Sequence, residues 1–159
     1  MRMFRNIILV FALALTVVSC SSDRSKNLQI QKAADIHLKA VAKSDSIMKI
    51  LVRQKKQVQK SLESETIPSN VKSYKAMLKS LNKSITLLND WNNDVAGVPG
   101  LEHEHDHSHD HNHDEDILDD MSDREILELQ KAYSEHLDKI EDKISEVITT
   151  IELYSQDAK

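Results

Sequence analysis

Six histidines occupy every second position of an acidic run that extends from residue 102 to residue 116. They are His103, His105, His107, His109, His111 and His113, and aspartate or glutamate fills most of the positions between them. Neutral imidazole is the commonest protein ligand for zinc, copper and nickel, and neighbouring carboxylates add oxygen ligands and attract cations. The run therefore predicts a binding site for divalent transition metals.

The alternating spacing lets all the imidazoles of this run lie on one side of an extended backbone. Structural zinc takes four protein ligands and catalytic zinc takes three plus water, so the run could hold about one or two ions. Imidazole and carboxylate ligands favour zinc(II), with copper(II) or nickel(II) as alternatives, whereas copper(I) prefers sulfur ligands that are scarce here. The alternative interpretation is that the run is a solvated polar spacer.

The amino terminus has the pattern of an export signal. Arg2 and Arg5 precede a largely apolar stretch of twelve residues, and the sequence Val-Val-Ser-Cys that follows ends at Cys20 and resembles a bacterial lipobox. Because a membrane-spanning helix needs about 20 apolar residues, residues 1–19 are predicted to be a lipoprotein signal peptide. The resemblance implies that Cys20 carries a lipid and that residues 20–25 form a lipidated tether. The alternative is a secreted protein with a free cysteine.

The cysteine content agrees with this placement. A single cysteine cannot form an intramolecular disulfide, and lipidation would protect a thiol that an oxidising compartment would otherwise attack. We therefore expect a lipid-anchored protein of the bacterial cell envelope, with the outer membrane favoured over the inner membrane.

The net charge is negative and unevenly distributed. Residues 20–159 hold 19 basic and 26 acidic side chains, a formal charge of −7, and residues 101–123 alone hold ten acids and no Lys or Arg. A negative total, few aromatic residues and no evident basic stripe argue against nucleic acid as a partner.

The rest of the chain is predicted to be helical, because its glycines and prolines all lie between segments with helical periodicity. The helices are expected over about residues 26–63, 69–94 and 122–156, within one domain that covers residues 26–159. A His-rich loop of residues 95–120 is expected to join the second helix to the third.

Each helix is expected to have one apolar stripe, with steps that mostly alternate between three and four residues. In the first helix the stripe consists of Ile30, Ala34, His37, Val41, Ser44, Met48, Leu51, Lys55, Val58 and Leu62, widened by Ala33, Ala40, Ile47 and Ile50. In the second it consists of Val71, Tyr74, Leu78, Leu81, Ile85, Leu88 and Trp91. In the third it consists of Leu129, Tyr133, Ile140, Ile144, Val147, Ile151 and Tyr154. Ser122 and Glu125 have the spacing of a capping box, and Met121 and Ile126 that of a hydrophobic staple, so the third helix should begin there.

Amphipathic helices bury their stripes only against one another or against a partner. We therefore predict an all-α fold, an up-down-up antiparallel three-helix bundle of coiled-coil character with a long disordered His/Asp-rich loop between helices 2 and 3. Because Ser44 and Lys55 interrupt the first stripe, a protein partner or a homodimer through the helical seam is an alternative.

The helix lengths place the end of the second helix, and therefore the histidine loop, opposite about His37 at the anchor end of the bundle. His37 and His136, with Asp90 or Asp94, then form a speculative second metal site. The alternative is that His37 is a packed core residue and that His136 is solvated.

The helical part also resembles a family, the small lipoproteins of the Bacteroidota that are commonly labelled viral A-type inclusion proteins. The residues that carry this resemblance are Ile36-His37 with Val41, Ile47-Met48-Lys49 with Leu51, Asp90-Trp91, and Met121-Ser122-Asp123. The resemblance implies a helical fold and lipid anchoring, and the family label names no activity. Since the family's linker before the last helix need not contain a histidine run, metal binding would be a local addition to the scaffold.

Two functions remain open, and neither is enzymatic. The sequence has no Gly-rich phosphate loop, nucleophile elbow or His-Glu-x-x-His helix. We expect a membrane-anchored lipoprotein that buffers, sequesters or delivers divalent metal, zinc foremost, through its histidine loop. The alternative is a non-catalytic structural or protein-interaction lipoprotein in which the loop is a solvated spacer.

Overall fold

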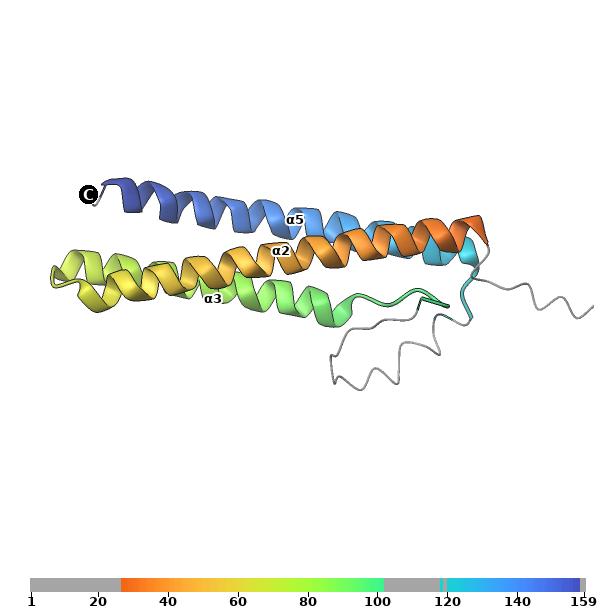
Figure 1. The fold of residues 1–159 in the computed structure, drawn as a ribbon, viewed down its shortest axis with the longest axis horizontal. Helices are drawn as coiled ribbons and strands as arrows, with labels where there is room; N and C mark the ends of the chain where they lie inside the picture. The colour runs from red at the N-terminus through yellow and green to blue at the C-terminus, as the bar shows by residue number, and fades with distance from the viewer. Residues whose placement is uncertain (1–26, 102–117, 119, 158–159) are drawn as a thin grey trace, which may run out of the picture.

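The computed structural model describes residues 27–101, 118 and 120–157, and within these ranges the chain forms three long helices and no strand (Figure 1). The helices pack against one another along their length. The prediction of an all-α fold is therefore confirmed. None of the helices in the described ranges combines the length and the apolar character that crossing a membrane requires.

The helices are α2 (Leu28–Ser64), α3 (Pro68–Asp94) and α5 (Asp123–Asp157). Their bounds agree within two residues with the helices predicted from periodicity. The predicted signal peptide, Cys20 and the tether lie outside the described residues.

Local sequence explains where each helix begins. The side-chain oxygen of Asn27 accepts a hydrogen bond from the backbone N–H of Gln29, which caps α2. Pro68 occupies the first turn of α3, where a backbone N–H has no helical partner to lose. The predicted capping box of α5 is present: the Ser122 N–H donates to the Glu125 carboxylate at 2.8 Å, and the Glu125 N–H donates to the Ser122 hydroxyl at 3.4 Å.

Side-chain contacts define the order in which the helices meet. Between α2 and α5 the contacts follow increasing residue numbers in both helices, pairing His37 with Gln130, Lys43 with Asp138, and Gln54 with Glu152. Between α3 and α5 they run in opposite order, pairing Asn70 with Tyr154 and Trp91 with Tyr133. The carboxyl end of α3 thus lies beside the first halves of α2 and α5, and we call this the loop end (Figure 1). The opposite end contains the α2–α3 turn, and we call the segment Lys49 to Lys83 the hairpin end.

The core follows a strict alternation of three and four residues. In α2 it consists of Ile30, Ala33, His37, Ala40, Ser44, Ile47, Leu51, Gln54 and Val58. In α3 it consists of Tyr74, Met77, Leu81, Ser84, Leu88 and Trp91.

In the predicted α2 and α3 stripes the alternate members from Ala34 to Lys55 and from Leu78 to Ile85 were wrong by one residue, although Ala33, Ala40 and Ile47 had been predicted to widen the α2 stripe. Ala33, Ala40, Ile47 and Gln54 take the central positions that were assigned to Ala34, Val41, Met48 and Lys55, and in α3 Met77 and Ser84 take those assigned to Leu78 and Ile85. Consecutive helical residues are about 100° apart, so both neighbours of a stripe position lie near the core. Only the packing of the other two helices decides which of them is central.

In α5 the predicted stripe omitted Ile126, Gln130 and Leu137, all of which are buried. Leu129 and Tyr133 lie beside the core and are partly exposed. Ser44, which interrupts the predicted stripe of α2, is fully buried and donates a hydrogen bond to the Asn92 side chain at 2.7 Å. Its hydroxyl is thereby satisfied without a partner protein.

The hairpin end has a basic outer surface. Exposed cations follow steps of three and four residues along α2, at Lys49, Arg53, Lys56 and Lys60, and along α3, at Lys72, Lys75, Lys79 and Lys83. The expectation that the chain has no basic stripe was therefore wrong. Total charge concealed these stripes because the acidic run at residues 101–123 outweighs them in the sum.

The base of the histidine loop

The six loop histidines, His103 to His113, lie outside the described residues. The structure does describe the two places where the chain leaves the bundle and returns to it. The chain leaves through Val95 to Leu101, after α3, and returns through Leu118 and Met121, before α5. The base of the candidate metal site can therefore be described from its supporting residues.

A tight turn closes the exit segment. The Leu101 N–H donates a hydrogen bond to the Val98 carbonyl at 3.1 Å, and Gly100 between them has a φ of 78°. Pro99 at the second position and a left-handed glycine at the third are the residues that a type II turn requires. The Val98-Pro99-Gly100-Leu101 sequence thus directs the chain into the histidine run with a defined local conformation.

Both sides of the loop base pack into one small apolar cluster at the loop end. Its buried members are Ile30, Ala33, Ala96, Val98, Leu118 and Ile126. Leu101 and Met121 pack against it from the exit and return sides. Met121 and Ile126 lie together there, as the hydrophobic staple predicted. The two ends of the loop are therefore held against the same part of α2 and α5.

The exit segment is also held by a buried amide. Gln130 of α5 is 1% exposed, and its side-chain nitrogen donates to the backbone carbonyls of Ala96 at 2.8 Å and Gly97 at 3.1 Å. Ala96 and Gly97 follow the end of α3, so their carbonyls have no helical N–H donor, and the Gln130 amide supplies the hydrogen bonds that the backbone lacks. Sequence reasoning missed Gln130, although its spacing of four residues from Ile126 and seven from Leu137 placed it on the stripe.

The same amide indicates that Nδ1 of His37 is the hydrogen-bond donor. Carbonyl oxygens only accept hydrogen bonds, so the Gln130 nitrogen must face Ala96 and Gly97 and its oxygen must face the imidazole. The Nδ1 of His37 lies 3.1 Å from that oxygen and therefore carries the proton that it donates. His37 is 4% exposed and acts as a packed core residue, which was the alternative to its role in a second metal site.

An ion-pair cluster lies about two turns further along α2. The Lys43 ammonium group donates to the Asp138 carboxylate at 2.7 Å and also contacts the Glu141 carboxylate. The hydrogen bond to Asp138, followed by that to Glu141, raises the pKa of Lys43 against the lowering effect of burial. Lys43 thereby links α2 to α5 next to the loop end.

The speculative second metal site is not assembled. His136, Asp90 and Asp94 are all exposed, whereas His37 is buried and bonded to Gln130. Across the ranges 27–101 and 120–157 together with residue 118, no group of three or more His, Cys, Asp or Glu side chains is arranged to hold a metal ion. The geometry thus favours the solvated interpretation of His136.

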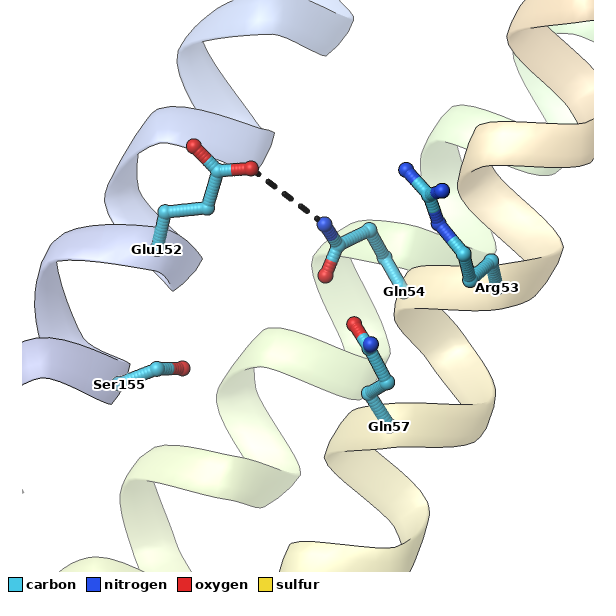
Figure 2. Close-up of a pocket in the computed structure, with 5 residues that line it drawn as sticks. All are labelled: Arg53, Gln54, Gln57, Glu152 and Ser155. Atoms are coloured by element: carbon cyan, nitrogen blue, oxygen red, sulfur yellow. Dashed lines mark hydrogen bonds between the residues drawn. The ribbon is translucent and has the colours of Figure 1, made fainter.

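A polar groove between α2 and α5 lies at the other end of the molecule. Figure 2 shows its lining residues, Arg53, Gln54, Gln57, Glu152 and Ser155, around a hydrogen bond of 3.5 Å from the Gln54 amide to the Glu152 carboxylate. Glu152 alone among them is a strong ligand for a divalent cation. The groove is therefore a solvated gap between two helices and does not compete with the histidine loop as a metal site.

Comparison with known proteins finds no match: no protein-family model, no curated protein and no solved structure matches the chain. The resemblance to helical lipoproteins of the Bacteroidota stays a prediction from the residues that carry it.

Proposed function

We propose that this chain is a lipid-anchored protein of the bacterial cell envelope that binds divalent transition metals, zinc(II) foremost, through its histidine loop. The observation that carries the proposal is the alternation of His103 to His113 with acidic residues. Imidazole supplies the ligands and the carboxylates raise the local concentration of cations. Copper(II) and nickel(II) fit the same ligands.

The arrangement of the loop base supports this role. A loop whose ends are already close together loses less conformational entropy when it wraps around an ion than a free chain of the same length. Leu101 and Leu118 belong to one apolar cluster, and the Gln130 amide holds the exit segment beside it. The folded bundle thus prepares the loop for binding before any ion arrives.

The proposed fold is an up-down-up antiparallel three-helix bundle with a long disordered His/Asp-rich loop between α3 and α5, from which the packed residues 95–101 and 118 are excluded. The proposed anchor is Cys20, cleaved after residue 19 and lipidated, in the outer membrane. Asn27, the first described residue, donates a hydrogen bond to Asp123 at the start of α5. Because Asn27 lies beside the return of the loop, the anchor and the histidines would lie at the same end of the bundle.

Zinc titration of two matched variants tests the proposal. The protein would comprise residues 20–159 with Cys20→Ser, so that no lipid is attached. One variant replaces the six loop histidines with asparagine. The other keeps them and carries Asp106→Asn, Asp110→Asn and Asp114→Asn. We expect about one or two zinc ions per chain at micromolar concentration, no such binding in the histidine variant, and weaker binding in the aspartate variant.

Acidification should weaken this binding because only neutral imidazole ligates a metal, and neighbouring carboxylates favour the protonated form. The affinity should fall between about pH 7.5 and about pH 5.5. Equal affinity in the parent and the histidine variant, or no change over this pH interval, would contradict the proposal. Metal analysis of protein purified from its native membrane then identifies the ion that the cell supplies.

A second candidate function is a non-catalytic scaffold that binds a protein partner or forms a homodimer. Large apolar side chains remain exposed on α2, with Leu38 at 47% and Val52 at 53%. The helical seam itself is filled by side chains of the three helices, so a partner would use outer surfaces of this kind. Capture of a stoichiometric partner that is indifferent to loss of the six histidines would favour this function over metal binding.

A further inference from the structure

The hairpin end carries a large excess of positive charge. Between Lys49 and Lys83 the chain has nine basic and two acidic residues. The basic residues are Lys49, Arg53, Lys55, Lys56, Lys60, Lys72, Lys75, Lys79 and Lys83. The acids are Glu63 and Glu65, both next to the α2–α3 turn. A segment with this balance has a strong positive potential.

The helical spacing displays these cations on the outside. Eight of the nine are exposed, and Lys55 is half-buried beside the seam. Four lie on the outer face of α2 and four on the outer face of α3, opposite the residues that fill the core. Each stripe extends over about 16 Å at 1.5 Å per residue. The turn between α2 and α3 brings the two stripes to one end of the molecule (Figure 1).

None of these side chains forms an ion pair within the described part of the chain. The ion pairs there join Lys39 to Asp35, Lys43 to Asp138 and Glu141, and Lys131 to Glu128, all outside the hairpin end. Arg53 and Glu152 both line the groove in Figure 2 without forming an ion pair. The positive charge of the hairpin end is therefore available to a partner.

An aliphatic side chain is exposed at the apex of this basic surface. Ile67 is 54% exposed in the turn between the two helices. The Glu65 carboxylate fixes the turn, because it accepts hydrogen bonds from the N–H groups of Thr66 at 2.9 Å and Ile67 at 2.8 Å and from the Asn70 amide at 3.0 Å. Ile67 is thus held at the tip with Lys60 and Lys72 on either side of it in the sequence.

We propose that the hairpin end docks on the phosphate headgroups of an anionic lipid bilayer, with Ile67 entering the interface. Lysine and arginine clusters that surround an exposed apolar residue are suited to such a surface, since charge attracts the headgroups and apolar burial adds to it. Cations on the outer faces of two helices around one apex fit a broad anionic surface better than a narrow groove. The only aromatic residue between Lys49 and Lys83, Tyr74, is buried, so no ring is presented for stacking on nucleic-acid bases.

Vesicle co-sedimentation of residues 20–159 with Cys20→Ser tests this docking. Vesicles of phosphatidylglycerol mixed with phosphatidylcholine are compared with vesicles of phosphatidylcholine alone, in the presence of EDTA so that metal binding by the loop plays no part. We expect binding to the anionic vesicles only. Raising the salt concentration from about 50 mM to about 300 mM should abolish most of it, because counterions screen exposed charges.

Two variants of equal net charge locate the surface. The hairpin variant replaces Lys72, Lys75, Lys79 and Lys83 with glutamine. The control variant replaces Lys32, Lys39, Lys139 and Lys143 with glutamine, and these lysines are equally exposed but lie outside the hairpin end. Each cation at an anionic surface strengthens binding by about fivefold, so the hairpin variant should bind well over tenfold more weakly. The control should change by much less, and Ile67→Ser should weaken binding further. Circular dichroism checks that both variants keep their helices.

Three results would overturn the proposal. They are equal binding to neutral and anionic vesicles, equal loss in the hairpin and control variants, and tighter binding to a DNA duplex than to vesicles at the same salt concentration. The last would assign the surface to nucleic acid. Zinc titration of the hairpin variant keeps this question separate from the proposed function of the loop, because that titration should match the parent protein.

Discussion

The loop end and the hairpin end use polar side chains in opposite ways. At the loop end, the buried Gln130 amide satisfies two backbone carbonyls and His37, and Lys43 joins α2 to α5 through two carboxylates. At the hairpin end, the cations of the outer faces have no ion-pair partner among the described residues, and Gln54 makes one long hydrogen bond. Satisfied buried polar groups specify one arrangement of the chain. Exposed charged groups without an ion-pair partner leave a surface available for binding.

This contrast suggests a division of labour along the molecule. The loop end must hold the two described ends of the histidine loop, on either side of residues 102–117, in a defined position. It does so with a separate apolar cluster and with directional hydrogen bonds. The hairpin end needs only the seam of the helices to stay folded, so its outer surface can carry charge without loss of structure.

Replacement of Trp91 should have the largest effect on stability. Trp91 is 1% exposed at the carboxyl end of α3, and its indole N–H donates to the Tyr133 carbonyl at 3.0 Å. Trp91→Ala should destabilise the fold by about 3–5 kcal/mol through the cavity and the lost hydrogen bond. Urea unfolding followed by circular dichroism measures this.

The control is Tyr154→Phe in α5, beside the hairpin end. It removes one hydrogen bond to Asn70 and keeps the ring that packs edge-on against Tyr74. The substitution should cost about 0.5–1.5 kcal/mol, the net contribution of one hydrogen bond. If this variant lost as much stability as Trp91→Ala, the loop end would not be the more tightly specified one.

Replacing each of two buried glutamines with leucine tests the same contrast between the two ends. Gln130→Leu removes the amide partner of His37 and of two backbone carbonyls. Because each buried group left unsatisfied costs about 1–3 kcal/mol, a loss of at least about 2 kcal/mol is expected. Gln54→Leu at the hairpin end removes one hydrogen bond of 3.5 Å and extends the apolar seam. Its stability should change by less than about 1 kcal/mol in either direction.

Thermal or urea unfolding of the two glutamine variants decides the matter. Equal losses would show that the polar network at the base of the loop has no special role. A loss confined to Gln130→Leu would also predict altered zinc affinity of the loop, because the exit segment would no longer be held at Ala96 and Gly97.

These glutamines also show what sequence could predict. The three helices and their ends were predictable because periodicity, Pro68 and the Ser122–Glu125 capping box are local signals. Which of two neighbouring residues is central in the seam was not, since that choice depends on how the other helices pack. The pairing of Gln130 with Ala96 and Gly97 joins residues more than thirty positions apart, and no local pattern records it.

The candidate site was predictable in a different sense. The ligand chemistry of the histidine run can be read from composition alone, and it falls on residues that the structure does not describe. The packing of the loop base could not be predicted in the same way, because the cluster of Ile30, Val98, Leu118 and Ile126 combines four separate segments of sequence. The basic hairpin end was missed because charge was summed over the whole chain, where the acidic run at residues 101–123 outweighs it.

Ser122→Ala should have a smaller effect, confined to the start of α5. The substitution removes the hydroxyl that accepts from the Glu125 N–H and donates to its carboxylate, and loss of an N-cap costs about 1 kcal/mol. Ser145→Ala, at an exposed position in the middle of α5, is the control and should be neutral or slightly stabilising because alanine favours helix. A loss of equal size in both variants would show that the cap contributes nothing.

The smallest expected effect concerns acid, and it should be alike at the two ends. Hydrogen bonds from Ser122 lower the pKa of Glu125 at the loop end, and hydrogen bonds from Ile67, Asn70 and Thr66 lower the pKa of Glu65 at the hairpin end. A carboxyl group with a lowered pKa stabilises the folded state above its ordinary pKa, and this contribution is lost as the pH falls through the lowered value. The melting temperatures of Glu125→Gln and Glu65→Gln should therefore lie below that of the parent protein at neutral pH and converge on it as the solution is acidified. Because the Glu125 carboxylate is exposed and that of Glu65 is only partly covered, their contributions should also shrink with salt. A gap that widened on acidification at either end would mean that the ionised carboxylate is not what stabilises the turn or the cap there.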